Sequence, residues 1–408
     1  MPNYLAPDIY IEEVPSGDRP IQAVGTSTAA FVGVAPDASK RVNETVAVNN
    51  WTQFLSQFVS EGSKSTPLSQ AVFGFFQNGG TRCYVVNVGD GKPIMGNGTG
   101  LNLLERIDEI AIVAAPGFID AGSYDAILTH CETLQDRVAV LDSPELVTDL
   151  NTLTQVATAP SRSARSRAAA SAASSETSAT TPAPSGGVRA RPSDGGFGAY
   201  YYPWITVRDP LSPNDLVNVP PSGHMAGIWA RTDATRGVHK APANEVVRGA
   251  LNVTHRLTRD EQGLLNQNGV NTIRLFAREG IRVWGARTVA DASSEWRYLN
   301  VRRLFNMIEE SIAESTRWIV FEPNDYTLWK SIRRDLSAFL TRIWRDGALM
   351  GRTPEQAFFV KCDEETNPPD IIDAGIVVTV VGIAPVKPAE FIVFRISQYA
   401  GGAQVETL

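Results

Sequence analysis

The feature that most limits the possible folds is a series of short apolar segments separated by stretches with helical periodicity. The apolar segments are 28–35, 83–88, 110–115 and 138–142, and the helical stretches are 67–78 and 121–135. Strands that are apolar almost throughout are buried on both faces, which is typical of a sheet covered by helices on each side. The sequence therefore predicts an α/β layer in the first half of the chain. Ordered sequence returns at 200–207, after a low-complexity stretch, and a helix is predicted after residue 223.

Two amphipathic helices are predicted in the last third, at 301–314 and 325–346. In the longer one, one apolar stripe is made by Leu328, Trp329, Ile332, Leu336, Phe339, Leu340 and Ile343. Asn324 or Asp325 can cap its start and Gly347 can end it. Further strands are predicted at 317–322, 357–362, 375–384 and 390–396.

A chain of 408 residues exceeds what one hydrophobic core usually supports. We therefore expect an α/β (α+β overall) protein with one α/β domain over 25–290 and a second over 291–396. Residues 158–196 are mainly Ser, Ala, Thr, Pro, Gly and Arg, which predicts a low-complexity surface insertion.

Both ends of the chain are predicted to be extended arms, over 1–24 and from 390 to the short tail at 397–408. Pro7, Pro15 and Pro20 exclude a helix from the first arm. The residues with strand character are Tyr10, Ile11 and Val14 at the N-terminus and Phe391, Val393 and Ile396 near the C-terminus. Long apolar edges are usually blunted in monomers because they recruit other chains, so these arms are expected to pair with other subunits.

Composition excludes several classes of function. A net charge of −7 gives no electrostatic footprint for nucleic acid, and three widely spaced cysteines suggest neither disulfides nor a zinc site. The N-terminus has no secretion signal and no segment is long enough to span a bilayer, so we expect synthesis in the cytoplasm and no direct membrane insertion.

Evidence for catalysis is thin, and we predict neither an enzyme, a cofactor nor a metal. Nucleophile-elbow, P-loop and zinc-protease motifs are absent, and the glycines of 89–100 are typical of a turn-rich loop. His130 and Cys131 are adjacent and would diverge on a helix, so they cannot act as a base and nucleophile pair. The acidic segment 363–373 lacks calcium-loop spacing and is expected to be a solvated loop.

The predicted helix over 325–346 has a basic face made by Lys330, Arg333, Arg334 and Arg345. One interpretation is an ordinary solvated helix face, and the other is a surface that docks onto an acidic protein. The residues alone leave both open.

Several long motifs resemble the phage tail sheath family, including its relatives in extracellular contractile injection systems. They are YLAPDIYIEEVPSGDRPIQAVGTSTAAFVGVAP (4–36), VPPSGHMAGIWARTD (219–233), GVHKAPANEVVRGA (237–250), WRYLNVRRLFNMIEESI (296–312), FLTRIWRDGALMG (339–351) and IAPVKPAEFIVFRI (383–396). The resemblance covers both ends and most of the middle of the chain. The insertion departs from it.

The resemblance implies a structural subunit that polymerises helically around an inner tube and contracts from a metastable extended state. It implies that 25–290 faces outward, that 291–396 faces the tube, and that the arms of neighbouring subunits add strands to the C-terminal domain. The helix over 325–346 would then rest on the tube. The implied partners are other copies of the chain, the inner tube protein, and baseplate and terminal cap proteins, in a phage tail or a contractile injection particle.

Two alternatives stay open. A ring-forming tail-terminator or baseplate relative would share the fold without making a long tube, and an α/β hydrolase-type enzyme would be a closed homo-oligomer.

Overall fold

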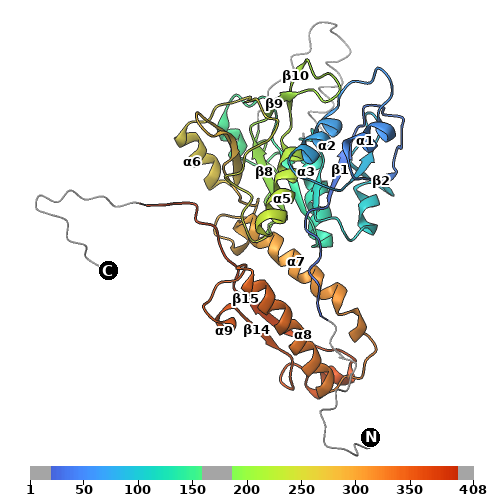
Figure 1. Ribbon diagram of the computed structural model, residues 1–408, viewed down its shortest axis with the longest axis vertical. Coiled ribbons are helices and arrows are strands. Elements are labelled where there is room, and N and C mark those ends of the chain that lie inside the picture. Colours follow the sequence, from blue (N-terminus) through green and yellow to red (C-terminus); the bar gives the residue numbers. More distant parts are fainter. Residues whose placement is uncertain (1–19, 159–185, 394–408) are drawn as a thin grey trace, which may run out of the picture.

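The computed structural model describes residues 20–158 and 186–393, which form two lobes joined by a long helix (Figure 1). We call residues 27–297 the large lobe, residues 20–26 and 298–385 the small lobe, and residues 386–390 the strap. Each lobe has its own apolar core, and the two cores of the large lobe lie on opposite faces of one sheet.

The large lobe is built on an eight-stranded sheet with the order β13-β12-β8-β7-β6-β1-β3-β2. Its strands are β1 (Ala29–Gly33), β2 (Thr45–Val48), β3 (Cys83–Asn87), β6 (Ile112–Ala114), β7 (Val138–Asp142), β8 (Gly198–Tyr202), β12 (Val270–Phe276) and β13 (Gly280–Val283). The six central strands pair in parallel, and β2 and β13 pair antiparallel at the two edges. This confirms the α/β layer predicted from the apolar segments.

Alternate residues of the central strands enter different cores. Ala29 and Phe31 of β1 face one set of helices, whereas Ala30 and Val32 face the other. The first set is α1 (Trp51–Phe58), α2 (Pro67–Gln77) and α5 (Ser222–Arg236); the second is η1 (Leu101–Arg106), α3 (Ala121–Leu134) and α6 (Arg259–Gln267). Burial on both faces is why these strands are apolar throughout.

Helices α2 and α5 cross at very short range because small residues lie between them. A Cβ atom on Gly227 of α5 would lie 2.5 Å from the carbonyl oxygen of Phe75, and one on Gly223 would lie 2.2 Å from that of Ala71. Only glycine permits this contact, and it lets the indole of Trp229 reach the core, where its Nε1–H donates to the Tyr201 hydroxyl at 3.0 Å.

The remaining elements are short. In the large lobe they are β4 (Met95–Gly96), β5 (Thr99–Gly100), η2 (Leu150–Thr154), β9 (Ile205–Arg208), β10 (Leu216–Val219), β11 (Asn252–Val253) and η3 (Glu295–Arg297). The β4–β5 hairpin occupies the glycine-rich segment, which is therefore the turn-rich loop that was predicted.

The small lobe consists of two long helices packed on a two-stranded sheet. Its elements are α7 (Leu299–Ser315), η4 (Arg317–Ile319), α8 (Tyr326–Arg345), α9 (Pro354–Ala357), β14 (Phe358–Lys361), α10 (Pro369–Asp373) and β15 (Val380–Ile383). Helix α7 joins the lobes, because Leu299 lies in a large-lobe core whereas Leu304 and Ile308 lie in the small-lobe core.

Helix α8 begins and ends where the sequence predicted. Asp325 accepts a hydrogen bond from the backbone N–H of Leu328, which caps the first turn. At the other end, Gly347 has φ +80°, and the N–H of Ala348 donates to the carbonyl of Ile343. This is the Schellman arrangement that glycine favours.

The strand prediction at 317–322 is wrong, and the one at 375–384 is only partly right. Residues 317–322 form the short turn η4 and a bend, and Phe321 is fully exposed with φ +71°, because the chain must reverse between α7 and α8. Of the predicted strand 375–384, only Val380–Ile383 pairs. The strand predicted at 390–396 stays a prediction: residues 391–393 lie outside any strand of the described chain, and 394–396 lie outside the described residues. The run at 200–207 is two strands, β8 and β9, separated at Pro203.

The insertion is shorter than predicted. Gly187 and Arg189 form bridges with Ala157 and Val156, Ala190 is buried, and Arg191 forms ion pairs with two carboxylates of α3. Residues 186–196 therefore belong to the packed large lobe. The prediction set the end of the insertion too late because the segment has few apolar residues, although some of them cover the sheet. The rest of the insertion, 159–185, lies outside the described residues.

Candidate assembly surfaces

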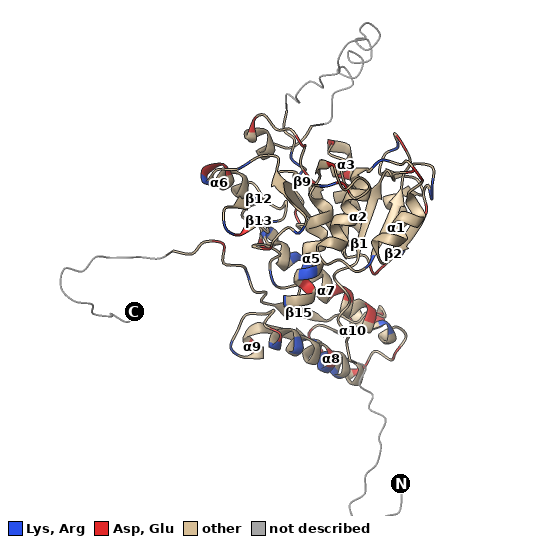
Figure 2. Ribbon diagram, turned by 45° about the horizontal axis from the view of Figure 1, so that its top comes forward, with Lys and Arg blue, Asp and Glu red and all other residues tan. Residues whose placement is uncertain are grey.

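The predicted basic face of α8 is exposed on the small lobe, and Figure 2 shows its row of basic residues. Lys330 and Arg345 are exposed, and neither forms a hydrogen bond or ion pair with another residue in 20–158 or 186–393. Arg333 lies 3.5 Å from the carbonyl oxygen of Cys362, and Arg334 donates to Asp335 at 3.0 Å. The four cations therefore share one side of the helix but differ in how firmly the subunit holds them.

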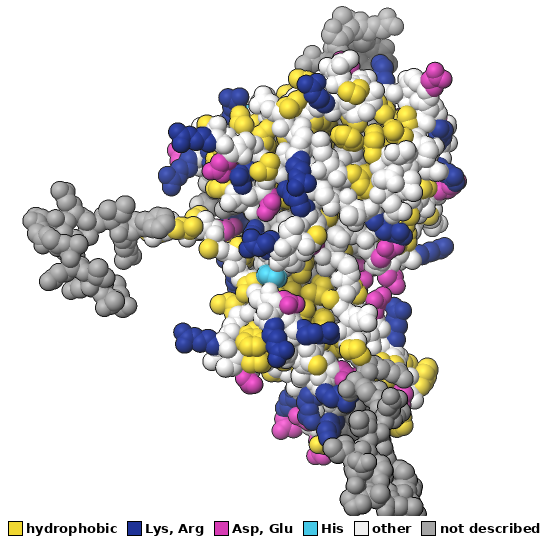
Figure 3. Space-filling model, viewed as in Figure 1, with side chains coloured by type: hydrophobic (Ala, Val, Ile, Leu, Met, Phe, Trp, Pro, Cys, Tyr) yellow, Lys and Arg dark blue, Asp and Glu magenta, His cyan; other side chains and the backbone are white. Residues whose placement is uncertain are grey.

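Lys330, Arg334 and Arg345 are exposed on this face, and Lys330 and Arg345 lie at its two ends. Fifteen helical residues separate them, which corresponds to about 22 Å along the axis. Exposed Ala338 and half-buried Thr341 lie between them on this side of the helix. An elongated, smooth, cationic surface of this kind suits an acidic partner that is itself extended. Dark blue side chains gather over the same small lobe in Figure 3.

Strands β14 and β15 form an antiparallel pair with unfilled edges. Phe358 pairs with Ile383 and Lys361 with Val380, and no further strand joins them within the described part of the chain. Helix α8 packs on one face of the pair, and Phe359 and Val380 are exposed. A two-stranded sheet is marginal alone, and its unpaired backbone groups can accept an added strand.

The predicted C-terminal arm leaves the subunit as exposed chain. Phe391 and Val393 are 76% and 77% exposed, and Ile392 between them is 72% exposed. Ile396 lies outside the described residues. Three consecutive exposed apolar residues are unusual on a monomer and indicate a segment that packs against something else.

The N-terminal arm is only partly described. Tyr10, Ile11 and Val14 lie outside the described residues. Residues 20–26, most of which the sequence placed in the arm, instead run along α7: Ile21 is buried, and the N–H groups of Gln22 and Val24 donate to the hydroxyls of Ser315 and Ser311. The root of this arm is therefore fixed on its own small lobe.

Polar contacts hold the lobes together, and sequence reasoning missed them. Arg303 of α7 forms a two-point ion pair with Asp233 of α5 and stacks on Trp229, with its Cζ atom 4.9 Å from the ring centroid. Its neighbour Arg302 stacks on Trp296 and donates to Asn306. The sequence could have indicated buried polar contacts here, because two arginines occupy buried positions of an amphipathic helix. It could not have identified the partner of Arg303, which lies far away in the sequence.

Three titratable groups of the large lobe, His130, His224 and Asp142, are buried. Burial lowers the pKa of His130 and of His224 to about 4, and the positive charge of Arg137 acts on His130 in the same direction. Burial also raises the pKa of Asp142 to about 7, although its carboxylate accepts hydrogen bonds from the N–H and hydroxyl of Ser222. These hydrogen bonds cap the start of α5, which has no cap of its own.

No cluster of metal-binding side chains occurs among the residues that the structure describes. Asp363 accepts backbone hydrogen bonds from Glu365 and Thr366, which makes the first part of the acidic segment a local turn. Its last part is not the predicted loop, because Asp370 and Asp373 lie in the short helix α10. No helix within 20–158 or 186–393 is both long and apolar enough to cross a membrane.

Two family models match consecutive parts of the chain. Residues 117–289 match the phage tail sheath protein central domain, and residues 291–398 match the phage tail sheath C-terminal domain. The border between the two matches, at residue 290, lies near the end of the large lobe, shortly before α7 begins at Leu299.

Curated tail sheath proteins are similar to part of the chain. The tail sheath protein of Vibrio phage KVP40 is 31% identical over 177 residues, which are 43% of this chain and 26% of that protein. A putative prophage major tail sheath protein of Pseudomonas aeruginosa is 27% identical over 48% of this chain and 49% of its own length. The chain thus spans only a quarter to a half of these relatives.

Solved structures match along nearly the whole chain. The sheath complex of an extracellular contractile injection system, PVC, in its contracted state matches with a TM-score of 0.72 and 29% identity over 98% of this chain and 99% of that one. The contracted helical sheath of the anti-feeding prophage matches with the same score and identity over 97% and 100%. The two lobes, the two consecutive family models and these full-length matches agree, and the chain belongs to the phage tail sheath family.

Proposed function

We propose that this chain is the structural subunit of a contractile sheath, in which copies of it polymerise helically around an inner tube. The observation that carries the proposal is the full-length match, at 29% identity, to a sheath complex of a contractile injection system. The chain acts by changing its packing and not by catalysis.

Contraction is a change between two lattices of the same subunits. The sheath assembles in an extended, metastable state and relaxes to a shorter, wider one, which drives the tube through a target envelope. The driving free energy is the difference between two sets of interfaces. A difference of about 3 kcal/mol per subunit already favours the contracted arrangement by roughly a hundredfold at each position. Cooperation between many subunits then makes contraction irreversible without nucleotide hydrolysis.

The terminal arms link neighbouring subunits by strand addition. Tyr10, Ile11 and Val14 of one neighbour, and Phe391, Val393 and Ile396 of another, complete the sheet begun by β14 and β15. The open edges of that pair and the exposure of Phe391 and Val393 support this assignment. Because each arm joins a different copy, the contact is head-to-tail and propagates into an open helix.

The small lobe lies inward, against the tube, and the large lobe lies outward. Lys330, Arg333, Arg334 and Arg345 of α8 contact an acidic surface of the tube protein. The exposure of Lys330 and Arg345, and the absence of any internal partner for them within the described chain, support these two as the main contacts. Salt-sensitive contacts of this kind hold the extended sheath on the tube yet release during contraction.

The sheath joins a baseplate at one end and a cap protein at the other, in a phage tail or a released injection particle. A second candidate role is a ring within such a baseplate. It is favoured by the match to the six-fold symmetrised baseplate of the anti-feeding prophage, with a TM-score of 0.72 over 97% of this chain. A ring-forming subunit would use the same fold but would close on itself.

Electron microscopy separates these roles. The chain is produced alone and together with its tube protein, and the particles are imaged in negative stain. A sheath subunit forms open tubes of variable length, whereas a ring-forming subunit or an oligomeric enzyme gives closed particles of one size. Closed particles in both samples would refute the sheath role.

A further inference from the structure

The strap, residues 386–390, connects the small lobe to the start of the C-terminal arm and touches the large lobe on its way. Lys387 and Ala389 are exposed, and the strap contains no helix or strand. Its two ends, however, are each held by a specific polar contact. The strap is thus a short segment fixed at two points.

The first contact fixes Val386 to the small lobe. Its N–H donates to the carbonyl of Ala348 at 3.1 Å, and its carbonyl accepts from the side-chain amide of Asn300 at 3.1 Å. The same amide donates to the carbonyl of His239, at 2.8 Å. This end therefore lies where α7 begins, at the junction of the lobes.

The second contact fixes Glu390 to the large lobe. Arg287 donates from Nε to Glu390 Oε1 at 3.0 Å and from Nη2 to Oε2 at 2.5 Å. The side chains are only 9% and 15% exposed. A paired, parallel contact between a guanidinium and a carboxylate fixes the orientation of both groups as well as their distance.

Arg287 is itself held rigidly. Asn271 of β12 is fully buried, accepts from the backbone N–H of Arg287 and donates to its carbonyl, each at 2.7 Å. The guanidinium also donates to the carbonyl of Asn266 at 3.0 Å. The Glu390 carboxylate is therefore tied through Arg287 to the edge of the central sheet of the large lobe.

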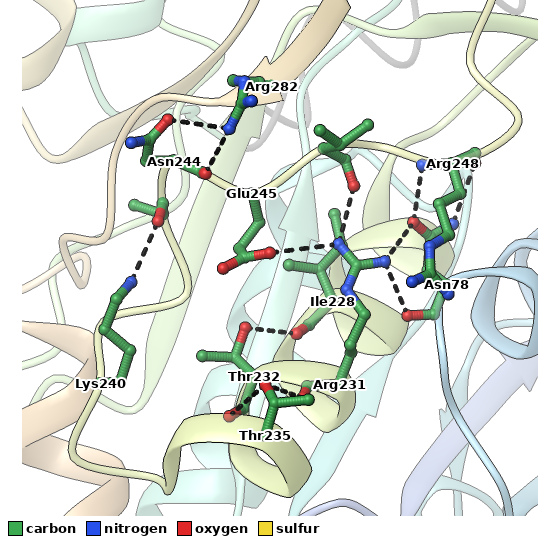
Figure 4. Close-up of polar contacts among 12 residues, drawn as sticks. Asn78, Ile228, Arg231, Thr232, Thr235, Lys240, Asn244, Glu245, Arg248 and Arg282 are labelled. Atoms are coloured by element: carbon green, nitrogen blue, oxygen red, sulfur yellow. Dashed lines mark hydrogen bonds and ion pairs between the residues drawn. The ribbon is translucent and has the colours of Figure 1, made fainter. Parts of the chain in front are cut away.

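Between the two contacts the strap lines one side of a hollow of about 420 Å³. The large-lobe side of the hollow is lined by Arg236, His239, Lys240 and Asn244, and Figure 4 shows the last two. Lys240 donates to the carbonyls of Ala241 and Ala243. Beyond Glu390 the next three residues are largely exposed. Within the described chain, the Arg287–Glu390 pair is thus the last ion pair before the exposed residues 391–393.

We propose that Arg287 is the positioning residue of the C-terminal arm: through Glu390 it makes the large lobe set the point and direction in which residues 391 onward leave the subunit. This inference rests on the proposed sheath function for its consequence. When the large lobe turns during contraction, the arm root turns with it, and the strain reaches the neighbour that holds the arm. Without the pair, the arm would start at Val386 on the small lobe and would not follow the large lobe.

Spin-label distances on the full-length chain test this directly. The three cysteines are buried, so cysteines introduced at exposed Asp260 on α6 and at Val393 can be labelled selectively. Dilution with unlabelled chain removes distances between subunits. We expect a narrow distance distribution in the parent and one about twice as wide in Glu390→Gln, which keeps the size of the side chain and removes its charge.

The matched control is Glu364→Gln, which removes an exposed carboxylate of the small lobe and should leave the distribution unchanged. Arg287→Lys keeps the charge but loses the two-point contact, so it should give an intermediate width. An unchanged width in Glu390→Gln would overturn the proposal, as would equal broadening in the control.

The measurement does not depend on tube formation. If the parent forms tubes but the width does not respond to Glu390→Gln, the arm-positioning role fails and the sheath function stands. If the width responds but the parent forms only closed particles, the sheath function fails and the contact is a local tether.

Discussion

Arg303 and Asp233 form an ion pair in which the two side chains are 3% and 6% exposed, with donor–acceptor distances of 2.9 and 2.6 Å. Thr26 joins the pair, since its carbonyl accepts from Arg303 and its hydroxyl donates to Asp233. One buried contact therefore ties together α7, α5 and the segment that leads to the N-terminal arm. It is one of several contacts that join the two lobes, beside the stacking of Arg302 on Trp296 and the hydrogen bond from Asn300 to His239.

Removing one partner of this pair should be costly. Arg303→Met leaves a buried carboxylate without its cation, which typically costs about 3–5 kcal/mol of unfolding free energy. Chemical denaturation of the parent and the variant measures the loss. The double variant Arg303→Met, Asp233→Asn should recover part of it. An equivalent change at the exposed pair of Arg41 and Glu44 should cost about 0–1 kcal/mol, and a similar loss at both pairs would contradict this account.

The crossing of α2 and α5 predicts a different kind of sensitivity. Gly227→Ala places a methyl group 2.5 Å from the Phe75 carbonyl oxygen, so the helices must separate, at about 1–3 kcal/mol. Gly263→Ala is the control, because nothing lies within 4 Å of its added Cβ and alanine favours a helix by about 1 kcal/mol. The two melting temperatures should move in opposite directions. A stabilised Gly227→Ala would refute the close crossing.

Asp142 predicts a defined dependence of stability on pH. Its pKa is raised from 3.8 to about 7, so between these values the folded chain keeps a proton that the unfolded chain has lost. The contribution of Asp142 to the unfolding free energy is therefore largest at low pH and falls as the pH rises toward 7. Asp142→Asn still accepts from Ser222 but does not ionise.

The unfolding free energy of Asp142→Asn should thus change less between pH 5 and pH 8 than that of the parent, by about 3 kcal/mol. Asp90→Asn, at an exposed turn, should leave the parent's pH dependence as it is. Identical pH profiles for the parent and Asp142→Asn would show that the buried carboxylate titrates normally.

The tube-facing assignment of α8 predicts a charge effect on assembly. Lys330→Glu combined with Arg345→Glu should reduce co-assembly with the tube protein by tenfold or more at low salt, because both lie on the exposed face of α8. Arg259→Glu with Arg278→Glu makes the same charge change on the large lobe and should co-assemble normally. Sedimentation of tubes at two salt concentrations measures this, and equal yields from both variants would remove α8 from the tube contact.

The pattern of apolar residues along a segment was enough to predict the central strands and helix α8. The strands around Phe31, Val85 and Val140 are buried on both sides and are apolar throughout, and α8 carries its own start and stop signals in Asp325 and Gly347. For these strands and for α8, the residues within the segment are sufficient to determine its secondary structure.

The failures have a common physical cause, which is that the partner lies far away in sequence. Residues 317–322 look like a strand by composition, but the reversal between α7 and α8 leaves them no strand to pair with. Arg303 and Arg287 look like surface charges, and only the fold brings Asp233 and Glu390 to them across 70 and 103 residues. Ile21 looked like part of a free arm because the groove that buries it is made by the last third of the chain.

The central claim is that the terminal arms link subunits into an open helical sheath. The most direct measurement is electron microscopy of full-length chain with its tube protein, beside chains that lack residues 2–17 or 394–408. These deletions spare Ile21 and Glu390, which the subunit uses itself. We predict long tubes from the full-length chain and none from either shortened chain, which should remain folded by circular dichroism. Long tubes from a shortened chain, or closed particles from the full-length one, would contradict the account.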